Sequence, residues 1–188
     1  MRQRSSGGPV TWGLPESTRI RGKEYGHRSD YREILKLLAL LSDESRPEFI
    51  RWHGALCYFY REALPQEAWE EAMAYLAAFL CAGEETAPGP RRFDWQQDAQ
   101  MIAAGVNAVA GFEVRSAPYL HWWTFLGYFR SMGEGQFSYV LGIREKLRQG
   151  KKLEPQEAEF YRTHRSQVQL KSPDTEEKRR LEAMLSAR

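Results

Sequence analysis

The sequence has very little cysteine: its 188 residues contain only Cys57 and Cys81. Two cysteines are too few for the disulfide framework of a small secreted protein, and they cannot form a cysteine-rich zinc site. Both lie among apolar residues in stretches with helical spacing. We therefore expect two reduced, buried thiols in a cytoplasmic protein.

Long apolar runs are also missing. No stretch approaches the roughly 18 consecutive apolar residues that a membrane-spanning helix requires. Arg2 and Arg4 are followed by serine, glycine and proline, whereas a signal peptide would continue with an apolar segment. The formal net charge is only +2, which gives no general attraction for nucleic acid. The composition therefore excludes an integral membrane protein, and we expect no signal peptide.

Common catalytic motifs are absent as well. The sequence contains no Walker A loop, no Gly-x-Ser-x-Gly elbow and no His-Glu-x-x-His pair. Gly133-x-Gly135 lacks the third glycine and the preceding strand of a dinucleotide-binding loop. His53 and Cys57 lie one helical turn apart and could reach one metal ion, but no second pair is spaced to complete a site of three or four ligands.

The remaining polar candidates have simpler explanations. Asp94 and Asp98 lie four residues apart, a spacing that can serve acid–base catalysis when both carboxylates face a pocket. Asp94, however, stands where a helix cap is expected. His121 is surrounded by apolar residues, where a buried imidazole bonded to a carbonyl is more common than a catalytic base. The sequence therefore predicts no enzymatic activity, no metal site and no cofactor.

The sequence does contain apolar residues at helical spacing along most of its length. Before the first helix, Arg21-Gly22 separates two short segments, and glycine supplies the positive φ that a tight hairpin turn requires. We expect a mainly α fold, a compact bundle of about six or seven short helices with a small N-terminal β-hairpin. The expected helical segments begin near Asp30, Ser45, Pro65, Asp94, Pro118, Phe137 and Pro155.

Glycine, proline and charge divide the chain into segments. Residues 1–13 are rich in glycine and proline and are expected to form a flexible leader. Residues 14–170 are expected to form a single helical domain whose two halves are joined by the breaker-rich loop 84–92. Residues 171–188 form a charged tail that we expect to be frayed without a partner.

Charge is unevenly distributed between these segments. Residues 31–90 contain five basic and ten acidic side chains, whereas residues 136–188 contain twelve basic and eight acidic ones. This arrangement would suit intramolecular packing or head-to-tail association, although such charges are usually just solvated. One basic cluster could follow nucleic-acid phosphates, but interspersed glutamates weaken its field. Its members are Arg144, Lys146, Arg148, Lys151 and Lys152.

The most unusual segment is residues 119–129, where aromatic side chains are concentrated. A helix that is apolar around most of its circumference lies either in the core, or half in the core and half in an interface. The second alternative is open because Trp and Tyr supply much of the energy of protein–protein binding. The candidate partner-binding residues are Tyr119, His121, Trp122, Trp123, Phe125 and Tyr128.

Three motifs carry a family resemblance. They are Phe93-Asp94-Trp95-x-x-Asp98-Ala99-x-x-Ile102, Tyr119-Leu120-His121-Trp122-Trp123-x-Phe125 and Phe137-x-x-Val140-x-Gly142-Ile143-Arg144. Together they resemble the bacteriophage "gene product fifteen" family, and the similarity extends from about Leu14 to about Leu170. The resemblance implies a small phage or prophage protein without enzymatic activity or cofactor, located in the cytoplasm of the bacterial host.

The gene order of that family implies a more specific function. Its genes commonly lie between those for the tail tube protein and the tape measure protein, a position typical of tail assembly chaperones. The expected partners are therefore the tape measure protein and the tail tube protein, with self-association in addition, and neither membrane nor nucleic acid. The alternatives are a structural tail or connector component of the virion and, third, a nucleic-acid-binding protein that uses the basic cluster.

Overall fold

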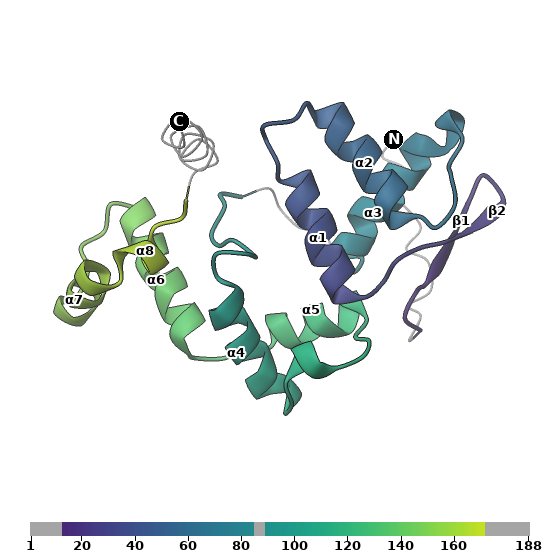
Figure 1. The fold of residues 1–188 in the computed structure, drawn as a ribbon. Helices are drawn as coiled ribbons and strands as arrows, with labels where there is room; N and C mark the ends of the chain where they lie inside the picture. The colour runs from purple at the N-terminus through teal and green to yellow at the C-terminus, as the bar shows by residue number, and fades with distance from the viewer. Residues whose placement is uncertain (1–12, 85–88, 172–188) are drawn as a thin grey trace, which may run out of the picture.

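The computed structural model describes residues 13–84 and 89–171 (Figure 1). Within these ranges the chain forms eight α-helices and one two-stranded sheet. The predicted mainly α fold with a small N-terminal hairpin is confirmed, and the count exceeds the expected six or seven because of one four-residue helix. The leader expected at 1–13 and the tail expected at 171–188 lie outside the described residues, apart from Gly13 and Lys171, and so does part of loop 84–92.

The described chain begins with the predicted hairpin. Its antiparallel strands are β1 (Ser17–Ile20) and β2 (Lys23–Gly26). Arg21 and Gly22 have φ values of 49° and 81°, and a tight turn with two positive φ values matches the twist of the flanking strands. The backbone N–H of Arg21 donates to the carboxylate of Glu71, and its guanidinium donates to the carbonyl of Glu67. The turn is thereby attached to the third helix.

Three helices follow in the first half of the chain. They are α1 (Tyr31–Leu41), α2 (Glu48–Phe59) and α3 (Trp69–Leu80), the last preceded by the 3₁₀ turn η1 (Gln66–Ala68). Asp30 caps α1 as predicted, because its carboxylate accepts from the N–H of Arg32 at 2.9 Å. Glu33 does not complete a capping box and instead pairs with Arg28 at 3.2 Å.

Five helices and one 3₁₀ turn follow in the second half. They are α4 (Ala99–Ala110), η2 (Val114–Ser116), α5 (Trp122–Arg130), α6 (Gln136–Arg148), α7 (Pro155–Thr163) and α8 (Arg165–Val168). The helix expected to begin at Asp94 begins five residues later. The carboxylate of Asp94 accepts from the N–H groups of Gln96 and Gln97, so it stabilises a turn in front of α4 and not the helix itself.

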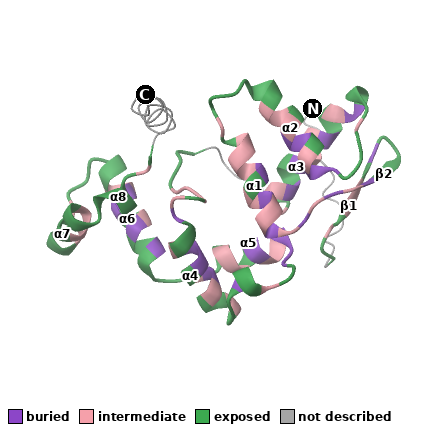
Figure 2. Cartoon of the chain, in the orientation of Figure 1, coloured by how far each residue is buried: buried purple, intermediate pink, exposed green. Residues whose placement is uncertain are grey.

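Both halves contribute to one hydrophobic core, which lies between the hairpin, α1, α2, α3, α4 and α5 (Figure 2). The rings of Tyr31 and Phe125 stack with centroids 4.4 Å apart. The backbone joins the halves directly as well, because the N–H of Trp122 donates to the carbonyl of Ser29 at 2.7 Å. Helix α5 therefore packs against α1 although about 90 residues separate Trp122 from Tyr31.

Helices α6, α7 and α8 lie on the opposite side of the molecule from the hairpin (Figure 1). Helix α6 contacts α4 and α8, and α8 contacts α7. Helix α7 contains no fully buried residue, so it lies at the surface of the described structure. None of the helices within 13–84 and 89–171 combines the length and apolar character needed to cross a bilayer.

The prediction of two buried thiols is wrong. Cys57 is exposed and Cys81 is half-buried. The buried residues of α2 are Ala55, Leu56 and Phe59, and at 100° per residue Cys57 falls on the other side of the helix. Apolar neighbours in the sequence did not reveal this, because they point in all directions around a helix.

Candidate protein-interaction site

The two adjacent tryptophans of the aromatic segment connect α5 to the end of α3. Trp122 is 1% exposed, and its indole N–H donates to the carbonyl of Leu80 at 3.0 Å. Trp123 is half-buried, and its indole N–H donates to the carbonyl of Phe79 at 2.8 Å. Both indoles therefore donate to carbonyls in the last turn of α3, where the regular helical hydrogen bonds end. The carbonyl of Phe79 also accepts from the N–H of Ala82 at 3.1 Å.

His121 and Phe125 belong to the core as well. His121 caps α5: its Nδ1 accepts from the N–H of Trp123, and its Nε2 donates to the carbonyl of Pro15, both at 3.0 Å. Because Nδ1 accepts a backbone N–H, it carries no proton, and the imidazole is the neutral tautomer with the proton on Nε2. Burial acts in the same direction, since it lowers the pKa of His121. This is the carbonyl-bonded histidine that its apolar surroundings indicated.

Tyr119 and Tyr128 lie nearer the surface. Tyr119 is 47% exposed, and its hydroxyl donates to Glu16 at 3.2 Å and lies 2.9 Å from the hydroxyl of Ser29. Tyr128 is half-buried against the core. Of the six candidate partner-binding residues, His121, Trp122 and Phe125 are thus buried, Trp123 and Tyr128 are half-buried, and only Tyr119 is exposed. Direct contact through the three buried side chains does not fit this fold, and a binding role for the segment stays a prediction.

The basic cluster is largely neutralised by carboxylates. Lys146 binds Glu157 at 2.7 Å and Arg148 binds Glu145 at 2.5 Å. The hydrogen bond from Arg148 lowers the pKa of Glu145 to about 2, so this pair remains ionised at neutral pH. Lys151 and Lys152 are exposed. A phosphate backbone would have to compete with these ion pairs, which does not favour the nucleic-acid hypothesis.

Arg144, also in that cluster, is a buried structural residue that the sequence reasoning missed. All five of its N–H groups donate: two to the carboxylate of Asp98, at 2.7 and 2.8 Å, and one each to the carbonyls of Arg92, Gln167 and Val168. The available signal was its position on the apolar stripe of α6, directly after Ile143. This ion pair connects α6 and α8 to the start of α4.

His53 and Cys57 do come together, with Nε2 and Sγ 3.7 Å apart on the exposed side of α2. The ring of His53 also packs against Trp69, with centroids 4.8 Å apart. Within the described ranges, no group of three or more His, Cys, Asp or Glu residues is placed to hold a metal ion. The pair is therefore a contact between two neighbouring turns, short of the three ligands that a stable metal site needs.

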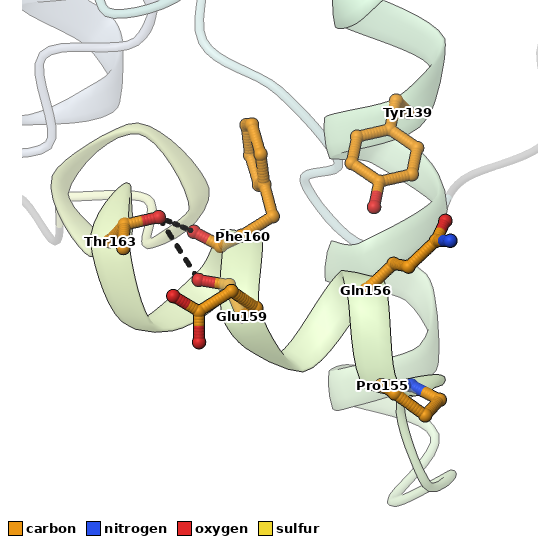
Figure 3. A pocket seen from close by; sticks show the side chains of 6 residues that line it. All are labelled: Tyr139, Pro155, Gln156, Glu159, Phe160 and Thr163. Atoms are coloured by element: carbon orange, nitrogen blue, oxygen red, sulfur yellow. Dashed lines mark hydrogen bonds between the residues drawn. The ribbon is translucent and has the colours of Figure 1, made fainter.

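An open groove between α6 and α7 has the chemistry of a protein-binding surface. It has a volume of about 530 Å³ and is lined by Tyr139, Pro155, Gln156, Glu159, Phe160 and Thr163. Figure 3 shows Tyr139 from α6 and Phe160 from α7 on either side of it. Their ring centroids are 5.2 Å apart at 83°, an edge-to-face contact. We call this surface the α6–α7 groove.

An ion pair between Lys146 and Glu157 connects α6 to α7 beside the groove. Within α7, the ring of Phe160 stacks on His164 at the end of the helix, with centroids 4.3 Å apart. Phe160 and Tyr161 are both only half-buried. The groove therefore keeps an aromatic surface open to solvent.

The fold and this surface define a helical protein whose accessible chemistry is suited to protein contacts. The chain matches the family described as Bacteriophage Gp15 protein over residues 11–170. It therefore belongs to this family, and the predicted resemblance is confirmed. No curated protein and no solved structure matches the chain.

Proposed function

We propose that this phage protein is a tail assembly chaperone that acts on the tape measure protein during tail morphogenesis. Membership of the Gp15 family supports the phage origin. The chaperone role is suggested by the gene order that the family resemblance implies. The structural observation that supports it is the α6–α7 groove. In this role the protein acts in the cytoplasm of the bacterial host, before the tail is complete.

The groove suits an amphipathic helical partner. Tyr139 and Phe160 offer two aromatic rings, which bury much apolar area at little cost in side-chain entropy. Pro155 adds an apolar surface, and Gln156, Glu159 and Thr163 provide polar groups. A partner helix with apolar residues at positions i and i+4 could place successive side chains against both rings. A long helical tape measure protein exposes such a stripe until the tail tube covers it.

Co-expression with the tape measure product of the same gene cluster tests the proposal. The full-length wild-type protein should co-purify with that product and increase its soluble fraction. Phe160→Ser and Tyr139→Ser should each reduce the co-purified amount by at least about fivefold, as expected for residues at the centre of an interface. Phe112→Ser is the matched control, because Phe112 is 43% exposed but lies outside the groove. A tape measure product that remains equally insoluble with and without the protein would contradict the proposal.

Mass spectrometry of purified virions separates this role from the structural alternative. A chaperone leaves the particle and should be absent from mature virions. Stoichiometric amounts in virions would instead indicate a structural tail or connector component.

A further inference from the structure

Two apolar surfaces outside the α6–α7 groove differ in the charge of their surroundings. The first, which we call the α2 tip, consists of Phe49 and Ile50. Residues 43–51 around them contain three acidic and two basic side chains, a net charge of −1. Phe49 is 71% exposed, the highest value for a large apolar side chain in the described part of the protein, and Ile50 is 39% exposed. Exposing a phenylalanine to this extent is unfavourable in water, so a partner that covers its ring would gain binding free energy from the buried apolar area.

The second surface is a hollow of about 330 Å³ beside α6, which we call the α6 hollow. Leu141, Leu147 and Leu170 supply apolar side chains, and Leu147 is 38% exposed. Four arginines and one acidic residue, Glu145, also line this hollow, and Glu145 pairs with Arg148. Arg92 is exposed there. The hollow therefore combines an apolar lining with an excess of positive charge, whereas the α2 tip has only a small excess of negative charge.

The wider surroundings have the same signs. Residues 42–84, which include α2 and α3, contain eight acidic and three basic side chains, a net charge of −5. Residues 136–171, which include α6, α7 and α8, contain eight basic and four acidic side chains, a net charge of +4. Local ion pairs cancel part of each set but preserve the sign. Complementary fields of this kind orient two approaching surfaces before they touch.

The two surfaces of one molecule cannot meet. Figure 1 places α2 with α1 and α3 on one side of the molecule and α6 on the other, and α4 and α5 connect the sides. We propose that the α2 tip of one copy inserts Phe49 and Ile50 into the α6 hollow of a second copy. Such a contact is head-to-tail: a bound pair still has one unused tip and one unused hollow, so further copies can add until a ring closes or a filament grows.

Sedimentation velocity of the purified full-length protein tests this interface and does not involve the tape measure protein, so its outcome is independent of the proposed function. The wild type should form larger species as concentration rises. Assembly should be weaker at about 0.5 M than at about 0.05 M salt, because salt screens the charge complementarity. Phe49→Glu places a carboxylate at the α2 tip, and Leu147→Glu places one in the α6 hollow. Each variant alone should be monomeric, with at least about a tenfold weaker self-affinity than the wild type.

Mixing the two variants gives the decisive result. Phe49→Glu retains an intact hollow and Leu147→Glu an intact tip, so the mixture should form a one-to-one heterodimer and nothing larger. Arg92→Glu gives a second way to block the hollow if Leu147→Glu does not fold. Phe112→Glu, an exposed substitution outside both surfaces, should assemble like the wild type. A monomeric wild type, single variants that still assemble, or a mixture that stays monomeric would each overturn the head-to-tail interface.

Discussion

At the scale of single residues, Arg144 and Asp98 depend on each other because both are removed from water. Their side chains are 8% and 0% exposed, and removing one member of a buried ion pair leaves the other charge uncompensated, at a cost of about 3–5 kcal/mol. We expect Asp98→Ala and Arg144→Ala each to lower the free energy of unfolding by about that amount. Urea denaturation followed by circular dichroism measures the loss.

The control for this prediction is Arg148→Ala, which breaks the exposed pair with Glu145 on the same helix. An exposed ion pair contributes roughly 0–1 kcal/mol, so this variant should be nearly as stable as the wild type. Equal losses for Arg148→Ala and Arg144→Ala would show that the buried pair has no special role.

Acid should weaken the cap of α5. Burial lowers the pKa of His121 below its ordinary value of 6.5, and burial acts in the same direction on His27. The unfolded chain therefore takes up protons first as the pH falls. The contribution of these two histidines to the free energy of unfolding should be unaffected well above pH 6.5, decrease as the pH falls below it, and level off below their folded-state pKa values.

His121→Asn tests the assignment of this effect. Its side-chain oxygen can still accept from the N–H of Trp123, since asparagine is a good N-cap, but it does not titrate. Between about pH 7.5 and about pH 5.5 the variant should lose less stability than the wild type, with the remaining loss from His27. Denaturant titrations at the two pH values give the comparison, and identical losses in both proteins would refute the role of His121.

At the scale of elements, two glycines should respond in opposite ways to replacement by alanine. Gly111 ends α4 with a φ of 77°, a left-handed conformation that is unfavourable for alanine, so Gly111→Ala should cost about 1 kcal/mol. Gly127 lies inside α5, and an added Cβ there would meet open space. Gly127→Ala should therefore stabilise the protein by roughly 0.5–1 kcal/mol. Thermal denaturation of the two variants measures both signs; destabilisation by Gly127→Ala would contradict the prediction.

Helix boundaries were predictable where a local contact determines them. The carboxylate of Asp30 caps the start of α1, and the positive φ of Gly111 ends α4. Both effects depend on the residue type alone, so the sequence pattern can indicate them. The start of α4 was misplaced because Asp94 makes the same kind of local hydrogen bond to a non-helical turn. An aspartate followed by free N–H groups predicts a cap, but it does not distinguish a helix from a turn.

At the scale of the whole molecule, Trp122 connects the two halves of the chain. Its indole is buried and hydrogen-bonded to the end of α3, so Trp122→Ala should cost about 3–5 kcal/mol. Because both halves share one core, we expect Trp122→Ala to unfold in a single transition. Amide hydrogen exchange in this variant should be faster than in the wild type in α1, α3 and α5 together. Faster exchange confined to α5 would contradict this coupling.

Trp123→Ala is the informative partner of that variant. Trp123 is only half-buried, so this variant should remain folded with a smaller loss of stability. A folded Trp123→Ala protein that no longer binds the tape measure protein would support an interface role for the aromatic segment. Two equally unfolded variants would support a purely structural role.

The sequence by itself determined the fold class, the hairpin and the family, because these depend on apolar spacing, on the positive φ available at Gly22, and on short motifs. Only the tertiary structure decided which side chains are accessible. It buried Trp122 and Arg144 and exposed Cys57 and Phe49, since burial depends on which helix face meets another helix far away in the chain. The aromatic segment that identifies the family therefore lies mainly in the core. The surfaces that we propose for partner contacts are formed by α2, α6 and α7.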